Sequence, residues 1–95
     1  MINLEDIITA INNNINATLV LQQKMTLHPK FKIYKVFSYS LYRIDTEEKE
    51  LLLDWSTTKN VSMEDITKTR IECDKQYLSI LVNWLSSDNF RNLKE

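Results

Sequence analysis

Glycine is missing altogether from the 95 residues, and proline occurs once, as Pro29. Because glycine is the residue that adopts positive φ angles without steric cost, its absence excludes the Gly-rich loops that bind nucleotide phosphates. Turns have to be made by Asn, Asp, Ser and Thr instead, and segments 45–48 and 56–60 have that composition.

Cysteine and histidine also occur only once each, as Cys73 and His28. A single cysteine excludes an intramolecular disulfide, and one cysteine with one histidine excludes the usual zinc sites. We expect no cofactor and no metal. A nucleophile paired with a base would need both residues together, and an exposed loop histidine with a small buried thiol is the simpler interpretation.

Acidic pairs are present, but they occupy positions where acids usually serve solubility. Glu5 with Asp6 and Glu64 with Asp65 fall in the first turns of predicted helices, and 47–48 falls in a predicted turn. Asp54 lies on a predicted strand, where an outward, solvated position is the simplest expectation. The sequence therefore predicts a protein that is not an enzyme.

Long apolar runs are absent too, since none approaches the ~18 residues that a membrane-spanning helix requires. The N-terminus starts with acids rather than with a basic segment followed by an apolar one, which is not the pattern of a signal peptide. The expected location is the cytoplasm, that of the host cell if a phage encodes the protein, with no membrane contact.

Acidic residues are missing from one long stretch, between Asp6 and Asp45. Residues 1–44 carry a net charge of +3 and residues 45–95 a net charge of −4. Such asymmetry either steers a charged partner or lets one half of the protein complement the other, within the molecule or in a dimer. At this length the chain, 1–95, is expected to form a single domain.

The first segment has the spacing of an amphipathic helix. Leu4, Ile7, Ile8, Ile11 and Ile15 share one helical face, and Asn3 precedes them as a possible N-cap. We favour a helix that continues to about residue 24. The alternative is an extended segment over 17–25, because the three asparagines at 12–14 lower helix propensity.

A period-two pattern begins at Lys30 and predicts a β-hairpin that joins about 31–44 to 49–57. The odd positions of the first strand should face the core. They are Phe31, Ile33, Phe37, Tyr39 and Leu41.

The stretch after Asn60 permits two interpretations. Apolar residues at steps of three and four suit one helix over 63–86, whereas the alternating residues of 67–73 suit a third strand followed by a helix from Lys75. Either way the sequence predicts an α+β fold. A small antiparallel sheet of two or three strands should have N-terminal and C-terminal helices packed on one face, in the order α-β-β-(β)-α.

The segment 30–43 combines aromatic with basic residues, which is the composition of a surface that binds macromolecules. The residues predicted to contact a partner are Lys30, Lys32, Tyr34, Lys35, Tyr42 and Arg43. The helix over 76–85 is apolar around much of its circumference, which favours a homodimer. The residues predicted for that interface are Tyr77, Leu81, Trp84 and Phe90.

The function that the sequence favours is macromolecular binding without catalysis. A short, glycine-free chain rich in Asn, Ile and Lys is typical of phage and mobile-element accessory proteins, which include anti-CRISPR-like inhibitors of a host protein or ribonucleoprotein. One alternative is a nucleic-acid-binding or regulatory protein that uses the 30–43 strand. A second alternative is a phage morphogenesis subunit, which would form rings or higher oligomers.

Overall fold

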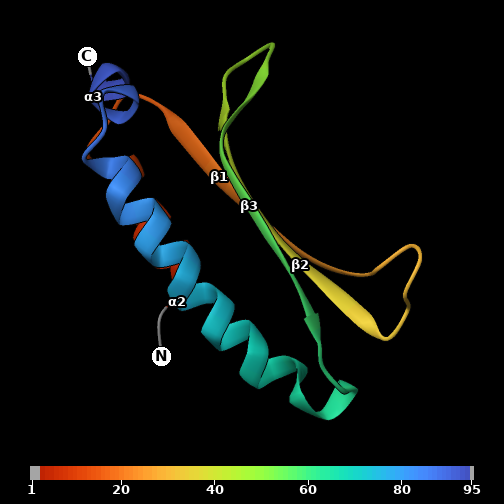
Figure 1. Ribbon diagram of the computed structural model, residues 1–95. Helices are drawn as coiled ribbons and strands as arrows, with labels where there is room; N and C mark the ends of the chain where they lie inside the picture. Colours follow the sequence, from red (N-terminus) through yellow and green to blue (C-terminus); the bar gives the residue numbers. More distant parts are fainter. Residues whose placement is uncertain (1–2, 95) are drawn as a thin grey trace.

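The computed structural model describes residues 3–94 and shows one open antiparallel sheet with helices on one face (Figure 1). The sheet order is β1-β2-β3. The predicted α+β class is confirmed. In chain order the elements are α1 (Leu4–Asn12), β1 (Thr18–Leu27), β2 (Tyr34–Ile44), β3 (Lys49–Asn60), the 3-10 turn η1 (Met63–Asp65), α2 (Ile66–Leu85) and α3 (Asp88–Lys94).

The first helix is shorter than the sequence suggested. Asn3 caps α1 as expected, because its side chain accepts hydrogen bonds from the backbone N–H groups of Glu5 and Asp6. The helix ends at Asn12, so the predicted extension to about residue 24 is wrong and the extended alternative is right. Residues 18–27 form β1, which pairs with β2 along its whole length, and this tertiary pairing outweighs local helix propensity.

A side-chain clamp joins the end of α1 to β1. The Asn12 amide donates to the carbonyl of Leu19 at 3.0 Å, and its oxygen accepts from the N–H of Leu19 at 2.8 Å. The two bonds copy the pattern that a neighbouring strand would make. Asn12 therefore provides hydrogen-bond partners for both backbone groups of Leu19 on the outer edge of β1.

The long helix α2 resolves the ambiguity after Asn60. Residues 66–85 are helical throughout, so the single-helix interpretation of 63–86 is right and the third strand over 67–73 is wrong. The third strand of the sheet is β1, which precedes the hairpin instead of following it. The buried face of α2 follows steps of four and three, through Thr69, Cys73, Tyr77, Leu81 and Trp84.

The hairpin of β2 and β3 is confirmed, with pairs from Tyr34 opposite Asn60 to Ile44 opposite Lys49 and one irregularity between Leu41 and Tyr42. The connecting turn begins at Asp45, whose carboxylate accepts from the N–H groups of Glu47 and Glu48, each at 3.0 Å. These bonds lower the pKa of the Asp45 carboxyl below its ordinary value. None of the residues 3–94 has a positive φ angle, so the turns are made without left-handed backbone.

The core lies between the sheet and the helices. The odd positions of β2 face the core as predicted at Phe37, Tyr39 and Leu41, which are buried against the helices. The rings of Tyr39 and Tyr77 stack with centroids 4.9 Å apart. The Tyr39 hydroxyl donates to Asp74 at 2.5 Å. Burial is the main cause that raises the pKa of Tyr39, and this hydrogen bond is the second.

The opposite face of the sheet carries no helix (Figure 1). Even-numbered side chains of β2, among them Tyr34, Ser38 and Tyr42, lie on this open face and are only partly buried. Within residues 3–94, no helix is both long and apolar enough to cross a membrane.

Candidate functional site

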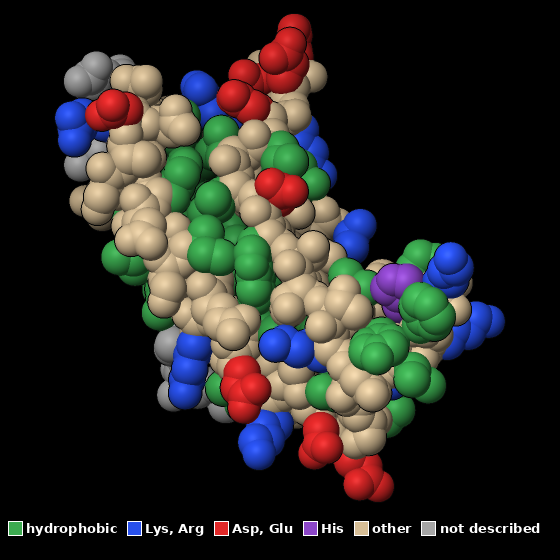
Figure 2. Space-filling view, viewed as in Figure 1, with side chains coloured by type: hydrophobic (Ala, Val, Ile, Leu, Met, Phe, Trp, Pro, Cys, Tyr) green, Lys and Arg blue, Asp and Glu red, His purple; other side chains and the backbone are tan. Residues whose placement is uncertain are grey.

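Exposed apolar side chains gather where β1 turns into β2. Leu27 is 53% exposed, Phe31 55% and Ile33 62%. Figure 2 shows apolar side chains around the single histidine at this end of the molecule, with lysines beside them. We call residues 27–34 the hairpin tip. Exposed apolar clusters on protein surfaces often mark interaction sites, so the three side chains make this end of the molecule the candidate contact surface.

The hairpin tip is held by its own hydrogen bonds. His28 Nδ1 accepts from the backbone N–H groups of Lys30 at 3.1 Å and Phe31 at 3.0 Å. Backbone bonds from His28 to Tyr34 and from Tyr34 to Phe31, each 2.9 Å long, close the loop. Pro29 fixes one φ angle within it. The apolar side chains are thus presented by a loop of defined conformation.

Ring contacts add to this order. The His28 and Phe31 rings lie 5.5 Å apart, and Phe31 meets Tyr34 edge-on at 6.4 Å. The histidine that the sequence left as an exposed loop residue is therefore partly buried and structural.

The charged side chains that the hairpin tip itself carries are basic. Lys30 and Lys32 flank Phe31, Lys24 is exposed on the neighbouring β1, and the sequence places no acid between Asp6 and Asp45. The tip thus offers apolar side chains with a basic rim.

The six residues predicted to contact a partner do not form one surface. Lys30, Lys32 and Tyr34 belong to the hairpin tip. Lys35 is only 8% exposed on the helix-facing side, where its Nζ donates to the carbonyl of Ile33 at 3.3 Å.

The other two lie at the far end of β2. Tyr42 is on the open face, and Lys49 Nζ sits 4.0 Å from its ring centroid. Arg43 is on the helix-facing side, where it lines a groove of about 370 Å³ together with Glu50 and Trp84. The structure therefore brings together three of the six residues at the tip.

The four residues assigned to a dimer interface are core residues of one protomer. Tyr77 and Leu81 are 0% exposed, Trp84 is 7% exposed and Phe90 is 9% exposed. The sequence-based assignment is corrected accordingly, because their apolar surface is already covered by the sheet and by α1.

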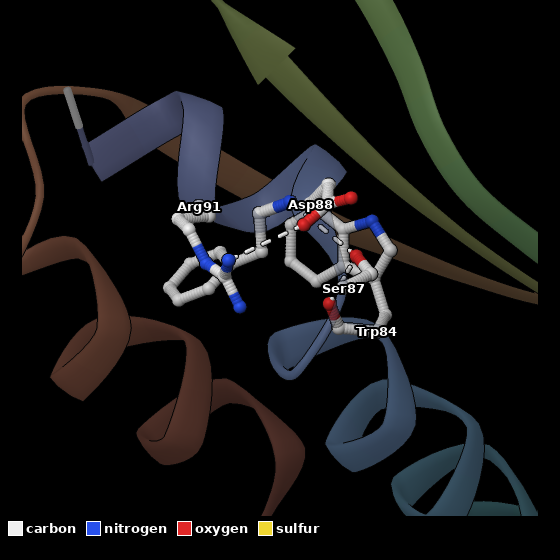
Figure 3. Close-up of polar contacts among 5 residues, drawn as sticks. Trp84, Ser87, Asp88 and Arg91 are labelled. Carbon is white, nitrogen blue, oxygen red and sulfur yellow. Dashed lines mark hydrogen bonds and ion pairs between the residues drawn. The ribbon is translucent and has the colours of Figure 1, made fainter.

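The corner between α2 and α3 explains why Trp84 and Phe90 are buried together. Ser87 Oγ donates to the Trp84 carbonyl at 2.6 Å, and Asp88 pairs with Arg91 at 3.4 Å (Figure 3). This corner turns α3 back, so that the rings of Trp84 and Phe90 meet at 5.2 Å.

Sequence reasoning missed Leu27, Phe31 and Ile33 as exposed residues. It continued the period-two pattern of β2 back through Phe31 and Ile33 and assigned both to the core, whereas β2 starts at Tyr34. The signal that could have located them was the His28-Pro29 pair, since a strand that meets proline turns or ends there.

Of the groups considered for catalysis, His28 forms hydrogen bonds within its own loop and Cys73 lies in the core. Cys73 is buried in the core, and burial raises the pKa of its thiol. Among residues 3–94, no group of three or more His, Cys, Asp or Glu side chains is arranged to hold a metal ion.

A comparison of the chain with protein-family models, curated proteins and solved structures finds no match. Function therefore has to be inferred from the surface of the molecule itself.

Proposed function

We propose that this is a small non-enzymatic binding protein whose hairpin tip inserts into an apolar pocket with an acidic rim on a protein partner. The observation that carries the proposal is the tip itself, where Leu27, Phe31 and Ile33 are each more than half exposed. Fully burying an exposed side chain of this size contributes about 1.5–3 kcal/mol, of which about half remains for each of these three, so together they supply a useful affinity.

Two further features favour binding through the tip. The loop is fixed by His28 before any partner arrives, which lowers the entropy lost on association. Lys30 and Lys32 would accelerate the encounter with an acidic surface and orient the complex. Inhibition or modulation of a host protein or ribonucleoprotein, as anti-CRISPR proteins perform, is the specific form of this proposal that the sequence composition favours.

Nucleic-acid binding is the weaker candidate. Tyr34 and Tyr42 share the open face, but they are eight residues apart on β2, about 26 Å at ~3.3 Å per residue. Two rings so far apart do not form one stacking platform for neighbouring bases. Lys35, one of the residues predicted to contact a partner, is buried.

The proposal is tested by affinity capture from a host lysate with a matched pair of variants. The tip variant combines Phe31→Ser and Ile33→Ser. The control combines Met63→Ser and Val82→Ser, which removes two apolar side chains of comparable exposure from η1 and α2. We expect the tip variant to lose the partner that the wild type and the control both retain.

Equal capture by the wild type and the tip variant would contradict the proposal. A fluorescent single-stranded oligonucleotide serves as the second probe. If it binds, and if binding falls steeply with salt and disappears in Lys32→Glu, the nucleic-acid alternative replaces protein binding.

A further inference from the structure

We propose that one partner of the hairpin tip is a second copy of this chain, which receives the tip on its open sheet face at the opposite end of β2. This inference rests on the proposed function, since it names an occupant for the same tip. It predicts a head-to-tail contact that repeats from copy to copy.

The receiving surface is an apolar patch on the open face, which we call the acceptor patch. Tyr42 lies at its centre, with Val20 opposite on β1 and Leu51 opposite on β3. Ile44 follows Tyr42 on the same face. Val20 is 40% exposed, Ile44 38% and Leu51 49%, and no described element covers them.

Charge selects what the acceptor patch receives. The adjoining segment 45–50 contains four acids and Lys49, so that its net charge is −3. The ammonium of Lys49 lies over the Tyr42 ring. The acids project from the turn between β2 and β3, at the top of Figure 2. An apolar patch beside negative charge complements an apolar tip beside Lys30 and Lys32.

The two surfaces cannot meet within one molecule. The hairpin tip precedes β2 and the acidic turn follows it, so the 11 residues of β2 hold them about 36 Å apart at ~3.3 Å per residue. The tip of one copy can therefore reach only the acceptor patch of another.

The same charges disfavour a two-fold dimer at either surface. Two tips face to face would oppose Lys30 and Lys32 with their own copies, and two acceptor patches would oppose acidic turns. Head-to-tail association places opposite charges together. Such a heterologous contact closes into a ring or continues as a filament, in agreement with the structural-subunit alternative.

The test uses two complementary variants in sedimentation velocity over a range of protein concentration. The tip variant is Phe31→Ser with Ile33→Ser, and the patch variant is Ile44→Ser with Leu51→Ser. The wild type should show a mass that rises beyond a dimer, because each copy has both surfaces. Each variant alone should stay monomeric, with self-association weakened at least about tenfold, as expected for the loss of a central apolar anchor.

An equimolar mixture of the two variants provides the decisive result. The patch variant keeps its tip and the tip variant keeps its acceptor patch, so the mixture should form a 1:1 pair that stops at twice the monomer mass. Circular dichroism establishes that each variant is folded. Raising the salt concentration should weaken the assembly, because salt screens the attraction between exposed charges.

Three outcomes would overturn the inference: a monomeric wild type at all concentrations, a single variant that still assembles, or a mixture that stays monomeric. The same experiments distinguish failure of this inference from failure of the proposed function. A monomeric wild type whose captured lysate partner depends on Phe31 leaves the tip as a binding surface for another protein. Assembly that needs the tip, with lysate capture that does not, supports self-association alone.

Discussion

At the scale of single residues, the one histidine of the chain stabilises the conformation of its own loop. His28 uses Nδ1 to accept two backbone N–H groups, and an imidazole protonated at that nitrogen could not do so. Its ring also supports Phe31 at the centre of the hairpin tip. The defined shape of the tip thus depends on a side chain that sequence reasoning had assigned no role.

Replacing His28 with alanine should loosen the tip. The variant leaves the N–H groups of Lys30 and Phe31 without their acceptor, and we expect a local cost of about 1–2 kcal/mol from the lost hydrogen bonds. Hydrogen exchange at Lys30 and Phe31 should accelerate while exchange in α2 stays unchanged.

The matched control is His28→Asn, because an asparagine side chain can accept from the backbone two and three residues further on. It should restore much of the protection at Lys30 and Phe31. Unchanged exchange in the alanine variant would show that neither the Nδ1 hydrogen bonds nor the His28–Phe31 ring contact fixes the loop.

At the scale of secondary structure, the sequence predicted what local patterns determine and failed where distant pairing decides. The N-cap at Asn3 and the hairpin of β2 and β3 follow from local signals. The segment 18–27 satisfies both helical and alternating patterns weakly, and β2 selects the strand by pairing with it. Phe31 and Ile33 were assigned to the core because the period-two pattern was continued back past Tyr34, where β2 begins.

The clamp between α1 and β1 provides a prediction about the sheet edge. Asn12→Ala removes both bonds to the backbone of Leu19, which is 2% exposed. We expect a loss of about 1–3 kcal/mol in the free energy of unfolding, because a buried backbone pair loses its partner.

The measurement is urea unfolding, with Asn13→Ala as the control, since Asn13 is exposed next to it. The control should change stability by less than ~0.5 kcal/mol. Helix propensity alone would make either substitution slightly stabilising. A similar loss in both variants would therefore show that the effect is not specific to the clamp.

At the scale of the whole molecule, the charge asymmetry noted in the sequence becomes a spatial one. The basic residues around the hairpin tip and the acids of 45–50 lie at opposite ends of β2, which agrees with the idea that one half complements another copy. The sequence alone could not show that two apolar surfaces accompany these charges. Their exposure depends on which sheet face the helices cover.

The burial of Trp84 changes what its removal should do. The sequence assigned Trp84 to a dimer interface, but this residue packs in the core with Phe90. We expect Trp84→Ala to destabilise the protomer by about 3–5 kcal/mol, the usual cost of emptying a core site of this size. Thermal unfolding measures the change.

Val82→Ala is the control on the same helix, because Val82 is 52% exposed. It should leave the melting temperature nearly unchanged. A folded Trp84→Ala variant of unaltered stability and lower mass would restore the original dimer assignment.

The absence of positive φ angles from residues 3–94 has a consequence for how this protein can diversify. No described loop position requires glycine, so the backbone itself forbids no ordinary side chain there. Residues at the tip can be exchanged by mutation without left-handed strain in the loop. Variants of one scaffold could therefore acquire new partners through substitutions at positions such as 30–33 while the sheet and helices stay as they are.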